Sequence, residues 1–316
     1  MGNRNLNSAR KAKNDEFYTQ LGDIENELEH YKNHLKGKVI FCNCDDPKFS
    51  NFWKYFYSNF DFLGLKAIIS THFEKDKPSY KLECQGAKDK EGKLITEITQ
   101  LSQNGDFRST EAIEVLKDSD VVVTNPPFSL FREYVDQLFE HDKKYLILGS
   151  VNVITYKEIF PLIKDNKMWV GHGCNKTMTF QLPDHYKKWE YISDSGEKHG
   201  KVFVSWYTNI HHSKRNEELI LYQTYAGNEN KYPKYDNYDA IEVSKVKDIP
   251  LDYQGVMGVP ITFLDKYNPE QFEIVGCNRG VGQDPNGVFG KSSYLNGKET
   301  FKRIFIKRKL NNEGTL

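Results

Sequence analysis

The sequence has no excess of either charge, since 44 lysines and arginines are balanced by 44 aspartates and glutamates. Its overall charge therefore does not indicate a nucleic-acid partner. It also lacks any apolar run near the roughly twenty residues that span a bilayer. Its first residues, MGNRNLNSARKAKNDEF, contain no apolar core of a signal peptide. We therefore expect a globular cytoplasmic protein with no membrane partner.

Cysteine is scarce as well, with five in 316 residues and no disulfide-framework spacing. Such usage is typical of a reducing compartment. Cys42 and Cys44 lie close together, but their spacing does not fit a zinc site and no cluster of histidine and cysteine accompanies them. We predict no bound metal. The length suits one large domain or a catalytic domain with a smaller appendage.

The most informative stretch is VVVTNPPF at residues 121–128. Its valines predict a short strand buried on both faces. Pro126 and Pro127 cannot donate to a ladder, so they end the strand, and Pro126 favours an extended Asn125. A helix of period 3.6 is expected from about Ser129. The segment therefore lies at the carboxyl end of a strand, where open α/β sheets bind ligands.

This segment offers a particular chemistry. The side-chain oxygen of Asn125 and the carbonyl of Pro126 could accept hydrogen bonds from one exocyclic amine, and Phe128 could stack on the ring that carries it. The alternative is a turn with Phe128 in the core. The segment resembles the Asn/Asp-Pro-Pro-aromatic motif of amino-methyltransferases that use S-adenosylmethionine.

An earlier stretch has the pattern of a cofactor loop. Residues 39–41 predict the first parallel strand, followed by a tight loop with Asn43, Asp45 and Asp46 and by an aromatic-rich helix. Doubly wound domains bind cofactors at such a loop. The usual glycine-rich fingerprint is absent, however. Either aspartate could instead cap the helix.

Residues 65–71 predict the second strand. An acid just after such a strand commonly holds a ribose hydroxyl pair, and Glu74 is the nearest acid, with Asp76 the alternative. Residues 75–104 are polar and turn-rich, which predicts a hairpin or an insertion. Further strands are expected at 144–149, 167–170, 202–209, 261–264 and 272–277, and a helix at 154–163.

Several long blocks share a resemblance to one family. The chain contains NDEFYTQ, FCNCDDP, GDFRS, VVVTNPPFSLFREY, WYTN and KYPKYDNYDAI…DIPLDYQGVMGVPITFLDKYNPEQFEIVG. Together these are similar to the EcoRI-type adenine-specific DNA methyltransferases from about residue 14 to 309. The resemblance implies a class I methyltransferase fold, which is a Rossmann-like α/β domain with a mostly parallel seven-stranded sheet. It also implies methyl transfer from S-adenosylmethionine to N6 of a flipped-out adenine in double-stranded DNA.

The resemblance also implies roles for cofactor-binding residues. Phe17, Tyr18 and Thr19 match a motif that contacts the methionine part of the cofactor. The Asp106 carboxylate is expected to accept from the adenine N6 amine of the cofactor, with Phe107 packed on the ring. The alternative for Asp106 is the N-cap of a helix at 110–117. Asn125 belongs to both the cofactor-binding and the catalytic sets.

One aromatic is expected opposite Phe128, on the other side of the flipped base. Tyr207 is favoured and Trp206 is the alternative, both within the strand at 202–209. A plain core aromatic is the other interpretation. Pro127 completes the predicted catalytic set.

The resemblance implies three regions: a basic arm at 1–13, a catalytic domain at 14–221 and a target-recognition region at 222–316. Residues 1–13 hold four basic residues and no acid, and residues 298–309 hold six basic residues and one glutamate. Such runs can be solvated faces or phosphate-binding surfaces. The predicted DNA contacts are Arg279 in the glycine-rich stretch 276–290 and four residues of the last run, Lys302, Arg303, Lys307 and Arg308.

A restriction–modification system is implied, with a cognate restriction endonuclease at the same site, or else an orphan or phage methylase. Rival interpretations are methyl transfer to RNA adenine or to a protein glutamine, and a DNA-binding relative without catalysis. The large C-terminal block argues against the glutamine version. The missing glycine fingerprint is the feature that favours the non-catalytic one.

Overall fold

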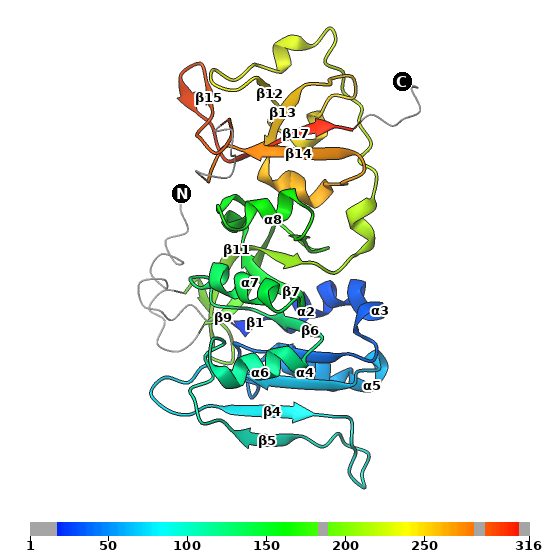
Figure 1. Ribbon diagram of the computed structural model, residues 1–316, viewed down its shortest axis with the longest axis vertical. Helices are drawn as coiled ribbons and strands as arrows, with labels where there is room; N and C mark the ends of the chain where they lie inside the picture. The colour runs from blue at the N-terminus through cyan, green and yellow to red at the C-terminus, as the bar shows by residue number, and fades with distance from the viewer. Residues whose placement is uncertain (1–17, 183–188, 281–287, 310–316) are drawn as a thin grey trace. The chain divides into compact units, whose positions relative to one another are not determined.

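The computed structural model describes residues 18–182, 189–280 and 288–309 (Figure 1). The chain forms two compact units. The first runs to Val151 and also takes in Gly173–His211, whereas the second holds Asn152–His172 and the chain from His212 onward. The second unit thus begins before the predicted boundary at residue 222 and includes an inserted segment of the earlier chain. The predicted basic arm lies outside the described residues.

Four parallel strands form the centre of the sheet in the first unit, in the order β3-β2-β6-β7. They are β2 (Val39–Cys42), β3 (Ala67–Thr71), β6 (Val121–Thr124) and β7 (Lys144–Ser150). Consecutive residues of β2, β3 and β6 are all buried, so both faces of these strands are covered. Runs of β-branched and apolar residues fit such positions, and the four predicted strands are confirmed.

Antiparallel strands extend this sheet on both sides. Beyond β7 lie β11 (Lys198–Thr208), β9 (Lys176–Leu182) and β1 (Tyr18–Thr19), with β10 (Tyr191–Ile192) also beside β11. Beyond β3, β4 (Tyr80–Cys84) and β5 (Glu97–Gln100) form the hairpin predicted for 75–104 (Figure 1). The predicted α/β class is confirmed, and the sheet is mixed.

The helices of this unit include the three that the sequence predicted. They are α2 (Leu21–Leu28), η1 (Glu29–Tyr31), α3 (Lys32–Leu35), α4 (Asn51–Ser58), α5 (Phe60–Leu63), α6 (Thr110–Asp118) and α7 (Phe131–Glu140). Ser50 caps α4 and Ser109 caps α6, each through its side-chain oxygen. Helix α7 begins two residues later than predicted, because a turn from Pro127 to Leu130 precedes it. No helix in the described part of the chain is long and apolar enough to cross a membrane.

The second unit contains a four-stranded sheet in the order β12-β13-β17-β14 and a separate hairpin of β15 and β16. These strands are β12 (Ala240–Glu242), β13 (Val256–Pro260), β14 (Phe272–Cys277), β15 (Tyr294–Leu295), β16 (Lys298–Glu299) and β17 (Arg303–Arg308). Its other elements are α8 (Phe160–Lys164), β8 (Trp169–Val170), η3 (Ser213–Asn216), η4 (Glu229–Lys231), η5 (Val246–Asp248) and η6 (Ile261–Lys266), while η2 (Val151–Thr155) begins at the boundary.

Two predicted elements were wrong. The helix expected at 154–163 is split into η2 and α8. Helix α8 begins at Phe160 with Pro161 in its first turn, where a residue without an N–H leaves no donor unpaired. The strand expected at 261–264 is the 3₁₀ helix η6, in which Phe263 and Leu264 supply the buried apolar pair. The strand itself lies just before, at β13, and the strand at 272–277 is confirmed.

Candidate active site

The order of the parallel strands reverses at β2, which has β3 on one side and β6 on the other. Ligands bind at such switch points, outside the carboxyl ends of the strands. The predicted cofactor loop follows β2 and the Asn-Pro-Pro-Phe segment follows β6. The two are joined by hydrogen bonds, since the hydroxyls of Thr124 and Tyr134 donate to the main-chain and side-chain oxygens of Asn43. Asn43 thus fixes one segment against the other.

The Asn-Pro-Pro-Phe segment combines a buried start with an accessible end. Asn125 is only 2% exposed and Pro126 is also buried, whereas Pro127 and Phe128 are partly exposed. Phe128 packs against the main hydrophobic core. The ring is therefore held from one side and open on part of the other, which suits a stacking surface. Both the predicted stacking role of Phe128 and its core alternative are compatible with this geometry.

The loop after β2 makes its turn without glycine. Cys44 has φ +78°, in the left-handed region that favours glycine. Asp45 is buried and accepts from the Ser50 hydroxyl at 3.3 Å, which ties the loop to the start of α4. Strained non-glycine positions of this kind cluster at functional sites. The absence of a glycine fingerprint therefore does not prevent the chain from forming the loop.

Three side chains converge beside Glu74 at the carboxyl ends of β2 and β3. His72 Nε2 lies 3.1 Å from Glu74 Oε1 and 3.9 Å from Asp46 Oδ2, and the Tyr80 hydroxyl donates to Asp46 at 2.6 Å. Burial, and then the bond to Asp46, raise the pKa of Tyr80. The ligand atoms of Asp46, His72 and Glu74 lie within 4.8 Å of one another, so their spacing also suits a metal ion. Sequence patterns did not single out His72 or Tyr80. Tyr80 reaches the site from the hairpin strand β4, and a pattern of neighbouring residues does not show such a contact.

Asp106 and Phe107 lie in the turn just before α6. The Arg108 guanidinium donates to the Asp106 carboxylate at 2.8 and 2.7 Å, and this contact lowers the pKa of Asp106. The carboxylate does not cap α6, since Ser109 does, so the N-cap alternative was wrong. Phe107 is buried with its ring 5.0 Å from that of Tyr134, and Gln137 donates to its carbonyl at 2.9 Å.

Gly105 is the position where this loop depends on glycine. Its φ is +72°, and an added Cβ would lie 2.0 Å from the carbonyl oxygen of His72. We expect Gly105→Ala to lower the free energy of unfolding by at least about 2 kcal/mol, since it combines left-handed strain with a backbone clash. Urea unfolding checks this. Gly92→Ala is the matched control, because Gly92 also has positive φ (+81°) but no atom within 4 Å of the added Cβ. Equal losses in the two variants would contradict the clash.

Thr19 lies beside the start of α4, where its carbonyl accepts from Asn51 Nδ2 at 2.7 Å. Within the described residues its buried hydroxyl has no hydrogen-bond partner, and the same holds for Thr71 at the end of β3. Tyr18 lies 6.3 Å from the ring of Phe49, which is 60% exposed. Phe17 lies outside the described residues. The sequence patterns did not single out Thr71.

The prediction that Tyr207 closes on a base was wrong. Tyr207 is fully buried, its hydroxyl donates to the Ser150 carbonyl at 3.0 Å, and its ring packs edge-on to Phe131 at 5.5 Å. The alternative, Trp206, is also buried, against Phe52. Residues near the end of β11 are covered on both faces, so neither ring can stack on a base without leaving the core.

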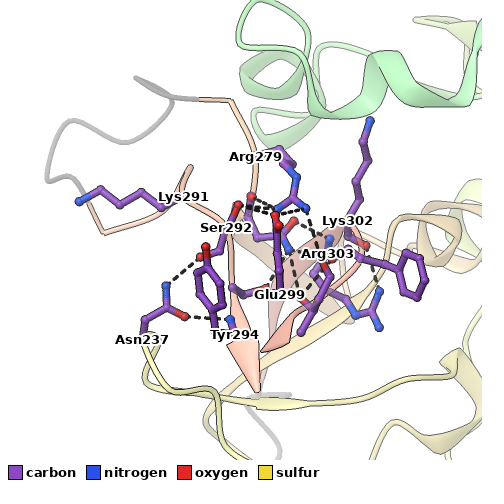
Figure 2. Close-up of polar contacts among 12 residues, drawn as sticks. Asn237, Arg279, Lys291, Ser292, Tyr294, Glu299, Lys302 and Arg303 are labelled. Atoms are coloured by element: carbon purple, nitrogen blue, oxygen red, sulfur yellow. Dashed lines mark hydrogen bonds and ion pairs between the residues drawn. The ribbon is translucent and has the colours of Figure 1, made fainter. Parts of the chain in front are cut away.

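The predicted DNA-binding residues lie in the second unit and differ in accessibility. Arg303 is 9% exposed and its guanidinium binds both carboxylate oxygens of Glu242 at 2.7–3.1 Å, so the prediction that it contacts phosphate was wrong. Arg279 donates to Glu299 at 3.0 Å, as Figure 2 shows, and Lys302 donates to Asn152 at 2.8 Å. Lys307 is exposed and Arg308 partly exposed, at the opposite end of β17.

Comparisons with known proteins identify the family of the chain. The profile of the family described as "Adenine-specific methyltransferase EcoRI" matches residues 5–309. The chain is 49% identical to "Type II methyltransferase M.EcoRI" of Escherichia coli, over 97% of each protein. It is 43% identical to "Type II methyltransferase M.MpnI" of Mycoplasma pneumoniae, over 97% of this chain and 98% of the relative. Type II methyltransferase M.MgeORF184P of Mycoplasma genitalium is 42% identical over 96% of this chain and 98% of its own length. The chain therefore belongs to the EcoRI family of adenine-specific methyltransferases.

Proposed function

We propose that this protein is a site-specific DNA methyltransferase that transfers a methyl group from S-adenosylmethionine to N6 of an adenine flipped out of duplex DNA. Family membership supports the reaction class. The observation that carries the assignment to a site is the buried Asn125 at the switch point of the sheet, in a segment that Thr124 joins to the cofactor loop. A glutamine or RNA substrate is the alternative, and the tritium-transfer experiment described below tests it.

The residues around the switch point fit S-adenosylmethionine. Buried hydroxyls without partners are costly, at about 1–3 kcal/mol each, and among the described residues Thr19 and Thr71 both have one. A polar ligand would satisfy them. We propose that Thr19 and Tyr18 hold the methionine part, Glu74 the ribose and Asp106 with Phe107 the adenine. Asp106 keeps an ionised carboxylate for this role because Arg108 lowers its pKa.

Replacing Thr19 by valine should affect stability and cofactor affinity in different ways. Valine keeps the shape but removes the buried hydroxyl, so the melting temperature of the free protein should stay the same or rise. The affinity for S-adenosylmethionine should fall about tenfold, which corresponds to the loss of one hydrogen bond. Calorimetry with thermal unfolding measures both. Unchanged affinity would contradict the contact with Thr19.

Catalysis in this proposal depends on positioning. The bound cofactor supplies an electrophilic methyl group on a sulfonium sulfur. The two N–H groups of the adenine amine donate hydrogen bonds to the side-chain oxygen of Asn125 and to the Pro126 carbonyl, which directs the lone pair of the nitrogen towards that methyl group. The nitrogen would form its bond to the methyl carbon as the carbon–sulfur bond breaks, with the electron pair of that bond left on sulfur. The nitrogen would then carry a positive charge and release its proton to water, so no strong general base is needed.

The target base must leave the helix first, at a cost of a few kcal/mol. We propose that the partly exposed ring of Phe128 stacks on the extruded adenine. Base–aromatic stacking contributes about 1–3 kcal/mol, which offsets part of the cost. With Tyr207 in the core, no aromatic is assigned to the other face of the base.

We also propose that the first unit is a class I methyltransferase domain and that the second unit provides target recognition. Its accessible basic residues, Lys307 and Arg308 among them, are candidates for phosphate contacts. The named relatives are type II methyltransferases, which supports a role in restriction–modification. A cognate restriction endonuclease acting on the same sequence, and a cytoplasmic location, belong to this proposal.

Transfer of tritium from labelled S-adenosylmethionine tests the substrate class. Plasmid DNA, total RNA and a protein extract are offered separately to the full-length protein. Incorporation into DNA alone is expected. Incorporation into RNA or protein would replace the DNA proposal by one of its rivals. A cofactor-induced thermal shift without any transfer would favour a relative that has lost catalysis.

A further inference from the structure

Phe301 is the most exposed large hydrophobic side chain among the described residues. Its side chain is 84% exposed, although it lies between the hairpin of β15 and β16 and the buried strand β17. Exposed phenylalanine in a flexible tail needs no explanation. The surroundings of Phe301 are different, because its backbone is fixed by buried polar groups.

Asn278 forms the main support of this backbone. It is fully buried, and its side-chain Nδ2 donates to the Phe301 carbonyl at 2.8 Å. Its side-chain oxygen accepts from the Arg303 N–H at 2.7 Å, and its own N–H donates to the Arg303 carbonyl at 3.1 Å. A single buried amide thus holds the chain on both sides of Lys302. Buried amides are costly unless satisfied in this way.

The residue before Phe301 is held equally well. The Thr300 N–H donates to the Ser293 carbonyl at 2.9 Å, and the Thr300 carbonyl accepts from Arg279 Nη2 at 3.2 Å. The hydroxyls of Ser293 and Thr300 lie 2.5 Å apart. Figure 2 shows how Arg279, Ser292 and Glu299 close the same cluster. Phe301 is therefore presented to solvent from a rigid base.

Basic residues lie close to this position in the sequence or bind its support. Lys302 follows directly, Arg279 binds the preceding carbonyl, and the exposed Lys298 and Lys291 lie in the same part of the unit. Glu299 is the acid of the cluster and is paired with Arg279. The pKa of Lys302 is lowered by burial and then by the nearby charge of Arg279. An anion would relieve this repulsion between two cations.

We propose that Phe301 inserts its ring against a base step of the DNA recognition sequence, while Arg279 and Lys302 bind the flanking phosphates. This inference rests on the proposed function and names a specificity element for it. Apolar wedges set among basic residues distort and read duplexes in this way. A ring on a rigid support loses little conformational freedom when it enters the stack, so its insertion is favoured.

The test compares Phe301→Ala with Phe62→Ala in the full-length protein on plasmid DNA. Phe62 is the matched control, because it is 72% exposed but lies in the first unit. Phe301→Ala is expected to raise the KM for plasmid DNA at least about fivefold. The KM for S-adenosylmethionine and the melting temperature should not change. Phe301→Trp should restore most of the DNA affinity.

The salt dependence of DNA binding distinguishes the role of Phe301 from that of Lys302. Phe301→Ala should leave the slope of log affinity against log salt unchanged, because a phenyl ring neutralises no phosphate, whereas Lys302→Ala should reduce it. A DNA KM for Phe301→Ala within about twofold of the Phe62→Ala value would overturn the inference. If the unchanged protein transfers no methyl group to DNA, the proposed function fails and the inference falls with it.

Discussion

Replacing Asn125 by alanine is expected to lower kcat for methyl transfer at least about a hundredfold, which is typical of losing one positioned hydrogen-bond partner of a reacting group. The substitution removes the side-chain acceptor but leaves the Pro126 carbonyl and the Phe128 surface. The affinity for S-adenosylmethionine should fall much less than the rate, because several other residues are proposed to hold the cofactor. Quenched turnover assays measure the rate of methyl transfer, and calorimetry measures the affinity for S-adenosylmethionine.

Asn125→Asp is the control for this result. Aspartate keeps a side-chain acceptor at the same position, so it should retain more activity than alanine. Thermal unfolding of both variants separates a loss of chemistry from a loss of fold, since Asn125 is buried. Retention of more than about a tenth of the wild-type turnover by Asn125→Ala would contradict the proposed role.

Replacing Arg303 by alanine should have the largest effect on stability. The substitution leaves Glu242, which is 3% exposed, without the guanidinium that binds both of its oxygens. Breaking a buried ion pair in this way costs about 3–5 kcal/mol. The hydroxyl of Tyr235 also donates to Glu242, so a shift of this carboxylate would disturb a second buried hydrogen bond. Urea unfolding followed by circular dichroism measures the change.

A double variant distinguishes a structural role from a DNA contact. Arg303→Met combined with Glu242→Gln removes both charges and keeps an acceptor for Tyr235, so it should be more stable than Arg303→Ala alone. Arg303→Lys should also destabilise, because lysine cannot reproduce the bidentate pairing. If Arg303→Ala were as stable as the wild type but bound DNA more weakly, the predicted phosphate contact would be restored.

The central strands were predictable because each is a short run of apolar and β-branched residues, and only a strand buried on both faces needs such a run. The Asn-Pro-Pro-Phe segment was predictable for a similar local reason, since two prolines can only end the strand. Its place beside the loop of Asn43 then follows from the strand order. These features depend on neighbouring residues and on general rules of sheet connection.

Features that depend on distant partners were not predictable. Arg303 has the sequence context of a basic surface run, but its partner Glu242 lies 61 residues earlier. Tyr207 lies in a segment with the sequence pattern of a strand. Only the structure shows that both faces of β11 are buried at this point and that the Tyr207 ring lies in the core. The cluster of Asp46, His72 and Tyr80 joins two strand ends and a hairpin. The left-handed turn at Cys44 replaces the glycine that a fingerprint search requires.

The most direct test of the central claim is to locate the methyl group. Plasmid DNA is treated with the protein and S-adenosylmethionine and then sequenced by a method that detects N6-methyladenine. The proposed function predicts methylated adenine at one position of a single short sequence motif, and much less of it in the same reaction time when Asn125→Ala replaces the wild type. Methylation at cytosine, or at adenines without a common motif, would contradict it.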